Sequence, residues 1–207
     1  MFLGAAEMMY MQGMGLLFNL LLILCSAVSL LLSARKLVHY FLWFFREDVY
    51  GGAPEFFVSL LCLAVLPVLA YPVSVLIPAI RQKGRDGQRS LAIYFSAVGY
   101  LAVFIYGFAA QVGRNLMLVY AGYFFSVVII LLFNKLLHVR ASGHACSVSG
   151  PLMYTAYFLG LWGIVVGAAL WGIIFWASLV MKRHTVSEFI LGTATCLVSF
   201  FSALLIF

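Results

Sequence analysis

The sequence predicts an all-α fold, a polytopic transmembrane helix bundle of about seven spanning helices. Of its 207 residues, 66% are apolar and only 9% are charged, and the mean hydropathy is +1.14. A soluble domain carries about a quarter charged residues and 45–50% apolar ones, so these values exclude a water-soluble globule. The longest polar stretch, 81–90, has ten residues and is too short for an extramembrane domain. We therefore expect one integral-membrane domain over residues 1–207.

Charge-free windows predict the individual spans, because a helix needs about 20 apolar residues to cross a hydrocarbon core of roughly 30 Å. Five windows are clear: 15–34, 56–80, 90–110, 115–134 and 186–207. Prolines within the second window predict kinks: Pro67, Pro72 and Pro78. Residues 35–54 place aromatic side chains between basic ones, a pattern typical of an interfacial segment. Residues 1–55 should thus form an additional N-terminal span followed by an interfacial segment.

The run 145–181 decides the number of spans. It has 37 residues without a charge, and a single helix of that length would measure about 55 Å, nearly twice the hydrocarbon core. Two short crossings with a turn near 160–167 fit better and give seven spans, with six as the alternative. Two crossings place His144 and His184 on the same side of the membrane, whereas one crossing places them on opposite sides.

The charge balance limits the partners. A net charge of +6 fits loops that face anionic lipid head groups or an anion-binding site, and so apolar a chain indicates no nucleic acid. The four cysteines form no CxxC pair, which predicts neither a disulfide framework nor a zinc site: Cys25, Cys62, Cys146 and Cys196. We expect bilayer lipids as partners and no metal. The oligomeric state and the membrane orientation stay open.

Two clusters of polar residues interrupt this apolar chain near predicted span ends, where ionisable groups are costly and functional by default. In the second cluster His184 and Glu188 are four positions apart at the start of the last helix, so they share a face. The carboxylate can accept the proton of one imidazole nitrogen and leave the other nitrogen free as base or nucleophile. Gly192 continues this face and would let another helix approach closely.

Anion binding is the common theme of the remaining residues. Lys182 and Arg183 can hold an anion at the positive end of the last helix. In the first cluster, Ser142 and Gly143 offer a hydroxyl and unhindered amides beside Arg140 and His144. Together these parts suit an anion between two imidazoles, one of which attacks while the other donates a proton to the leaving oxygen.

The motifs resemble the type 2 phosphatidic acid phosphatase family. The run Arg140-Ala-Ser-Gly-His144 is similar to the Pro-Ser-Gly-His signature of that family, and His184 with Glu188 is similar to its last signature, His-x-x-x-Asp. The resemblance extends more loosely over residues 78–192, within a phosphatase-like core of residues 78–207, and is closest to short prokaryotic members. It implies an integral, multi-pass protein of the prokaryotic cytoplasmic membrane that hydrolyses lipid phosphates or diphosphates without a cofactor.

Carried over residue by residue, the resemblance implies His184 as the nucleophile that forms a phosphohistidine, Glu188 as its orienting carboxylate and His144 as the general acid. An isoprenoid (di)phosphate or a phosphatidic-acid-like lipid would be the substrate. The implied and candidate phosphate-binding residues are Arg140, Ser142, Gly143, Lys182, Arg183, Lys135, Arg85 and Arg89.

Four departures from the family pattern keep an alternative open. Ala141 replaces the family proline and Glu188 its aspartate, which are mild changes. Ser178 stands where the family has a phosphate-binding arginine, and the first signature has no match, so Lys135, Arg85 and Arg89 are candidates for its role. The alternative is a weak or inactive relative that binds or scaffolds anionic phospholipid. A transporter is disfavoured, because polar residues do not gather near the middle of several spans.

Overall fold

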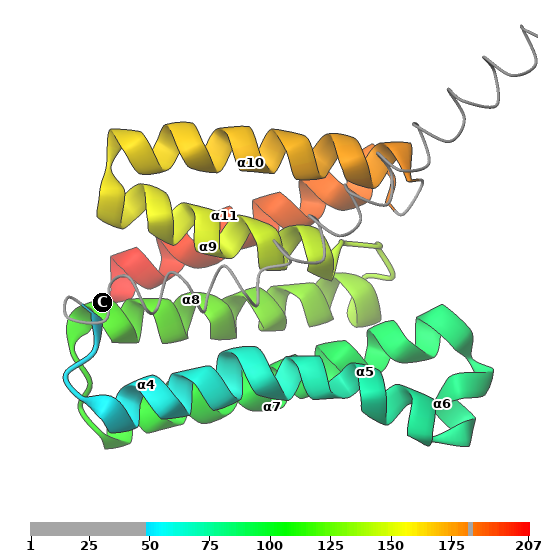
Figure 1. Ribbon diagram of the computed structural model, residues 1–207, viewed down its shortest axis with the longest axis horizontal. Helices are drawn as coiled ribbons and strands as arrows, with labels where there is room; N and C mark the ends of the chain where they lie inside the picture. The colour runs from blue at the N-terminus through cyan, green and yellow to red at the C-terminus, as the bar shows by residue number, and fades with distance from the viewer. Residues whose placement is uncertain (1–48, 182–183) are drawn as a thin grey trace, which may run out of the picture.

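The computed structural model describes residues 49–181 and 184–207, and all regular elements in these ranges are helices (Figure 1). Five helical segments are long and apolar enough to cross a membrane: Ala53–Leu76, Asp86–Ala109, Arg114–Leu136, Leu161–Val180 and Val186–Ile206. The predicted helical membrane bundle is therefore confirmed. The predicted span 15–34 and most of the interfacial segment lie outside the described residues, so the total of seven spans stays a prediction.

The first described span is built from three helical pieces, α4 (Ala53–Ser59), the π-helix η1 (Leu60–Val65) and α5 (Leu66–Leu76). Proline lacks an N–H and frees the carbonyl four residues before it, and the wider π turn lies directly before Pro67. Ile77 is extended before Pro78, as expected for a residue that precedes proline. The span therefore ends at Leu76, four residues before the predicted end, and the short α6 (Pro78–Gln82) follows.

The next two predicted spans are α7 (Gly84–Ala109) and α8 (Arg114–Leu131), and α8 continues into the π-helix η2 (Leu132–Leu136). The two helices pack against each other. Helix α8 contacts α7, α9 and α11 and is more buried than the other spans that the structure describes. It is the centre of the bundle, whereas α5 and α10 lie at opposite edges (Figure 1).

The run 145–181 is divided between two antiparallel helices, α9 (Gly143–Leu159) and α10 (Leu161–Val180), which pack against each other. They join at Gly160, whose φ of 59° lies in the left-handed region that favours glycine. The predicted turn is therefore confirmed. Helix α11 (Val186–Ile206) then runs alongside α8 and α9. The starts of α7, α9 and α11 and the ends of α8 and α10 lie at the same end of the bundle, which we call the site end (Figure 1).

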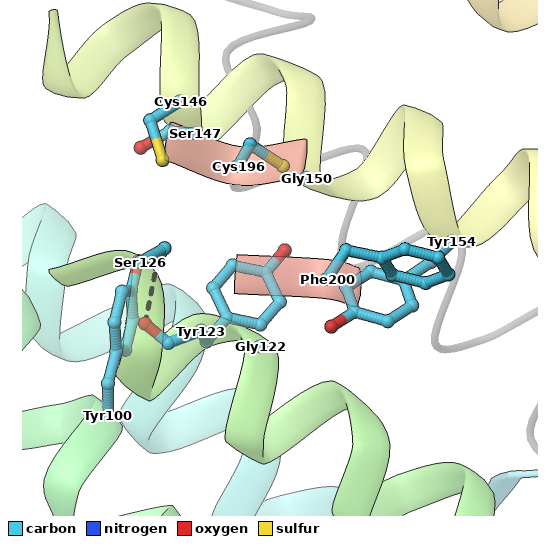
Figure 2. Close-up of a pocket in the computed structure, with 10 residues that line it drawn as sticks. All are labelled: Tyr100, Gly122, Tyr123, Ser126, Cys146, Ser147, Gly150, Tyr154, Cys196 and Phe200. Atoms are coloured by element: carbon cyan, nitrogen blue, oxygen red, sulfur yellow. Dashed lines mark hydrogen bonds between the residues drawn. The ribbon is translucent and has the colours of Figure 1, made fainter. Parts of the chain in front are cut away.

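A small cavity lies in the core between α7, α8, α9 and α11 (Figure 2). Its wall includes the polar side chains of Tyr123, Ser147, Cys146 and Cys196. The volume is about 30 Å³, which is room for a water molecule or two. A lipid tail does not fit into this cavity.

Candidate active site

The first turn of α11 places the predicted carboxylate. Thr185 is the N-cap residue, and its hydroxyl accepts a hydrogen bond of 3.2 Å from the backbone N–H of Glu188. The Glu188 carboxylate in turn accepts one of 3.2 Å from the backbone N–H of Thr185. This reciprocal pair is a capping box, for which the sequence pattern Thr-x-x-Glu is the signal. Glu188 is therefore held in place by its own helix start.

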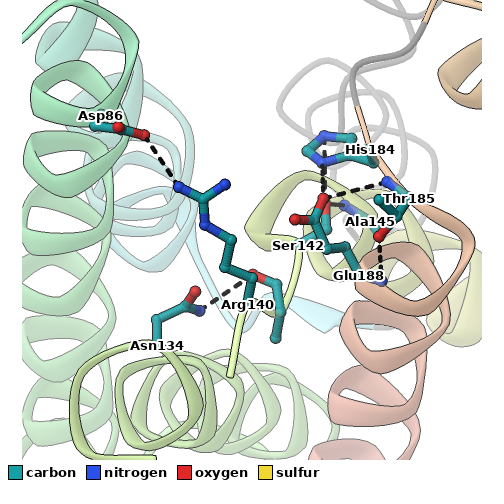
Figure 3. Close-up of polar contacts among 9 residues, drawn as sticks. Asp86, Asn134, Arg140, Ser142, Ala145, His184, Thr185 and Glu188 are labelled. Atoms are coloured by element: carbon teal, nitrogen blue, oxygen red, sulfur yellow. Dashed lines mark hydrogen bonds and ion pairs between the residues drawn. The ribbon is translucent and has the colours of Figure 1, made fainter. Parts of the chain in front are cut away.

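His184 precedes this cap and faces the same carboxylate. Its Nδ1 atom lies 3.6 Å from Oε2 of Glu188, and the two side chains are only 12% and 14% exposed. The separation is within ion-pair range but longer than a good hydrogen bond. The predicted pairing of His184 with Glu188 on one face is thus present in the structure (Figure 3).

The start of α9 is bound directly to the start of α11. Ser142 is fully buried and caps α9, because its Oγ accepts a hydrogen bond of 3.1 Å from the Ala145 N–H. Its backbone N–H donates a bond of 2.9 Å to the Glu188 carbonyl. A Cβ atom on Gly192 would lie 2.3 Å from the Ser142 carbonyl oxygen and 2.9 Å from the Ala145 Cβ. The close approach predicted at Gly192 is therefore confirmed.

These contacts bring the two histidines together, although 40 positions separate them in the chain. The rings of His144 and His184 are nearly parallel, with an interplanar angle of 15° and centroids 6.0 Å apart. Nε2 of His184 also lies 3.4 Å from Ser142 Oγ. The expectation that both histidines lie at one end of the bundle is confirmed. This follows from the two antiparallel helices over 145–181, which return the chain to the end at which it started.

The backbone adds an electrostatic contribution. The first N–H groups of a helix lack intrahelical partners and carry roughly half a positive charge together. Two such helix starts, those of α9 and α11, meet at the histidine pair. The first turn of α9 is open at Gly143, because a Cβ atom added there would meet no other atom within 4 Å. The arrangement therefore suits a compact anion.

The predicted cations are distributed less closely. Arg140 extends toward α7, where its guanidinium lies 3.8 Å from Asp86, and both side chains are largely exposed (Figure 3). The Lys135 ammonium lies 5.7 Å from the centre of the Tyr94 ring, also on α7. Both cations are therefore at the site end, where their charged groups are directed to α7.

The remaining phosphate-binding candidates lie in different surroundings. Arg89 is half-buried on α7, and Arg85 belongs to the same helix. Lys182 and Arg183 lie outside the described residues. Ser178 stands where the family that the motifs resemble has an arginine, and it is an uncharged side chain buried within α10, only 1% exposed.

Sequence reasoning missed two polar residues that shape this end of the bundle. Asp86 is the partner of Arg140. The Asn134 amide donates to the carbonyls of Ile130 and Ala141, at 3.0 and 3.1 Å, and so ties the loop before α9 to the end of α8. An amide near the end of a predicted span was the available signal for Asn134, whereas Asp86 in a basic loop carried none.

The arrangement can support nucleophilic and acid–base chemistry on an anion, since an imidazole backed by a carboxylate faces a second imidazole. Among the residues that the structure describes, no three His, Cys, Asp or Glu side chains are grouped so that they could hold a metal ion.

No family model matches the chain, and neither a curated protein nor a solved structure is significantly similar to it. A function for this protein is therefore argued from the geometry of the site.

Proposed function

We propose that this membrane protein is a metal-independent lipid phosphate or diphosphate phosphatase. The observation that carries the proposal is the meeting of His144 and His184, with ring centroids 6.0 Å apart, at the joined starts of two helices. In-line transfer of a phosphoryl group between an attacking nitrogen and a donating nitrogen needs roughly 7 Å between those atoms. With ring centroids 6.0 Å apart, the two imidazoles are close enough to contact one phosphoryl group.

The reaction has two steps. Nε2 of His184 attacks phosphorus, while His144 donates a proton to the leaving oxygen. The leaving group is a lipid alcohol when the substrate is a lipid monophosphate, and a lipid monophosphate when the substrate is a lipid diphosphate. Water then attacks the phosphohistidine, giving its proton to His144 and releasing inorganic phosphate. Glu188 stabilises the imidazolium that the first step requires. The amides at the start of α9, with the Ser142 hydroxyl, stabilise the charge on the phosphoryl oxygens.

The location at a helix-bundle end supports a lipid substrate. The site end is where the spans begin and end, so a phosphate bound there would lie at the membrane–water interface. The core cavity is too small for a tail, and the apolar outer surfaces of the spans face lipid. We therefore place the tail on the lipid-facing surface, with the phosphate at the histidines.

The decisive experiment measures phosphate release by the purified protein in detergent, with an isoprenyl diphosphate and phosphatidic acid as substrates and vanadate as inhibitor. His184→Ala and His144→Ala should each reduce release to background. His138→Asn is the matched control, because His138 is exposed at the same end, has a φ of 53° that asparagine tolerates, and has no proposed role. Full activity of His184→Ala would refute the proposal.

The second candidate is a non-catalytic protein that binds anionic phospholipid at the same place. The burial of Ser178 and the contacts of Arg140 and Lys135 with α7 favour it, since a phosphatase needs cations around the transferred group. Phosphate release above background that His184→Ala abolishes would exclude a pure binder. Retention of anionic lipid without any release would support it.

A further inference from the structure

The hydroxyl of Ser142 has one hydrogen to donate, and its surroundings determine where that hydrogen goes. A serine hydroxyl offers one donor and two lone pairs. One lone pair accepts the Ala145 N–H at 3.1 Å, as the N-cap of α9 requires. Nε2 of His184 lies 3.4 Å from Oγ, within reach of the hydrogen. Because Ser142 is fully buried, bulk water does not compete for this hydrogen.

The contact on the other side of the His184 ring determines which of its two nitrogens carries the proton. Nδ1 lies 3.6 Å from the Glu188 carboxylate, which can only accept hydrogen bonds when ionised. In the neutral tautomer that this carboxylate favours, Nδ1 carries the proton and Nε2 holds a lone pair. This lone pair and the hydrogen of the serine hydroxyl are complementary. The backbone bond from Ser142 N–H to the Glu188 carbonyl, 2.9 Å long, holds the two residues in this register.

We propose that Ser142 is a positioning residue that covers the Nε2 lone pair of His184 while the site is free of ligand, and that an arriving phosphoryl group uncovers it. The hydroxyl rotates about its C–O bond, so that O–H···N is replaced by O–H···O–P. No proton is transferred in this exchange. The serine hydrogen thereby leaves Nε2 when an oxygen that accepts this hydrogen is present. This inference rests on the proposed function for its second half, the response to a phosphoryl group.

A different role for the same residues is an acyl-transfer site. Ser142, His184 and Glu188 stand in the order of a serine–histidine–carboxylate triad. The bond from the Ala145 N–H to Oγ argues against a serine nucleophile, because it engages one of the two lone pairs of that oxygen in the cap of α9. Labelling of Ser142 by a fluorophosphonate probe would overturn the positioning role.

The test measures how fast diethyl pyrocarbonate, which reacts with unprotonated imidazole nitrogen, modifies His184 in the ligand-free protein in detergent. Mass spectrometry of the peptide that contains His184 gives the rate without interference from His144. Ser142→Ala should raise the rate about 2- to 10-fold, the factor that corresponds to loss of one neutral hydrogen bond. Ser142→Thr keeps the hydroxyl and should react at the rate of the unmodified protein. An unchanged rate in Ser142→Ala would overturn the inference.

Loss of the α9 cap could also expose His184 by fraying, and Thr185→Ala is the matched control for this. It removes the N-cap hydroxyl of α11 next to His184 but leaves Ser142 intact, and N-cap hydroxyls stabilise their helices to a similar degree. Thr185→Ala should therefore leave the modification rate within twofold of the starting protein. A rise equal to that of Ser142→Ala would overturn the inference.

A measurement on the unmodified chain does not depend on any variant folding. In protein labelled with ¹⁵N-histidine, the His184 ring should show a proton on Nδ1 and a hydrogen-bonded, unprotonated Nε2. A neutral ring with its proton on Nε2 would overturn the inference. These readouts need no catalytic activity. Covered Nε2 with no phosphate release would count against the phosphatase alone, and release with an uncovered Nε2 would count against the role of Ser142 alone.

Discussion

At the scale of single residues, Glu188 serves two purposes with one carboxylate. It completes the capping box of α11 with Thr185 and it faces Nδ1 of His184. A capped helix start and a histidine–carboxylate pair are therefore not competing interpretations of this motif. The cap holds the carboxylate in the position from which it can orient the imidazole, which is how a supporting residue contributes to a site.

Glu188→Gln separates the two purposes. Glutamine retains an oxygen that can accept the Thr185 N–H, so the helix start should lose less than about 1 kcal/mol. It loses the charge that stabilises an imidazolium, so phosphate release should fall by at least about 100-fold. Thermal unfolding in detergent and phosphate release measure the two effects. Glu188→Asp, the residue of the resembling family, should retain more activity than Glu188→Gln, and equal activity of Glu188→Gln and the unmodified protein would contradict this role.

At the scale of elements, the site depends on the contact between the first turns of α9 and α11. Ser142 connects them through its backbone, and Gly192 permits the approach because a side chain there would overlap the Ser142 carbonyl. His144 belongs to α9 and His184 directly precedes α11. Any change in the spacing of these two helices therefore changes the distance between the imidazoles.

Gly192→Ala should test this dependence. The added methyl group would lie 2.3 Å from the Ser142 carbonyl oxygen, so the helices must shift, at an expected cost of about 1–3 kcal/mol. Phosphate release should fall along with the unfolding temperature. Gly172→Ala on α10 is the control, because a methyl group there would meet no atom within 4 Å and alanine favours a helix interior. Equal behaviour of the two variants would show that the spacing of α9 and α11 does not control the site.

At the scale of the whole molecule, the alternation of α7 to α11 places the polar clusters at one end. The reversal at Gly160 is essential, because it returns the chain to the end at which α9 began. One unbroken crossing over 145–181 would separate the histidines by the thickness of the membrane. The helix bundle thus brings the two polar motifs, one at the start of α9 and one at the start of α11, into one site.

Labelling with a membrane-impermeant maleimide tests this arrangement in vesicles of each orientation. In a chain without its native cysteines, Lys83→Cys and Val139→Cys should react from one side of the membrane. Ala110→Cys and Leu161→Cys should react from the other side, since all four positions are exposed at the ends of described helices. A single crossing of residues 145–181 would give a different pattern. Leu161→Cys would then be protected from both sides, and Lys83→Cys and Thr185→Cys would react from opposite sides.

Most of the fold could be predicted from the sequence, because transfer of apolar residues into lipid is a property of composition along the chain. The windows 115–134 and 186–207 differ from the observed helices by at most a few residues at each end, whereas α7 begins six residues before the window 90–110. The end near Pro78 was less accurate, since the extended residue before a proline depends on backbone sterics and not on hydropathy. Of the site, the pairs that lie within one helical turn, such as His184 with Glu188, were predictable from spacing.

The sequence by itself determined the membrane bundle, the turn that divides 145–181 and the local histidine–carboxylate motif, because hydropathy and helical periodicity act over short distances in the chain. Only the tertiary structure decided which groups meet across helices: Ser142 beneath Nε2 of His184, and Arg140 directed to Asp86. These contacts depend on interhelical packing to within an ångström or two, and no pattern along one chain encodes that distance directly.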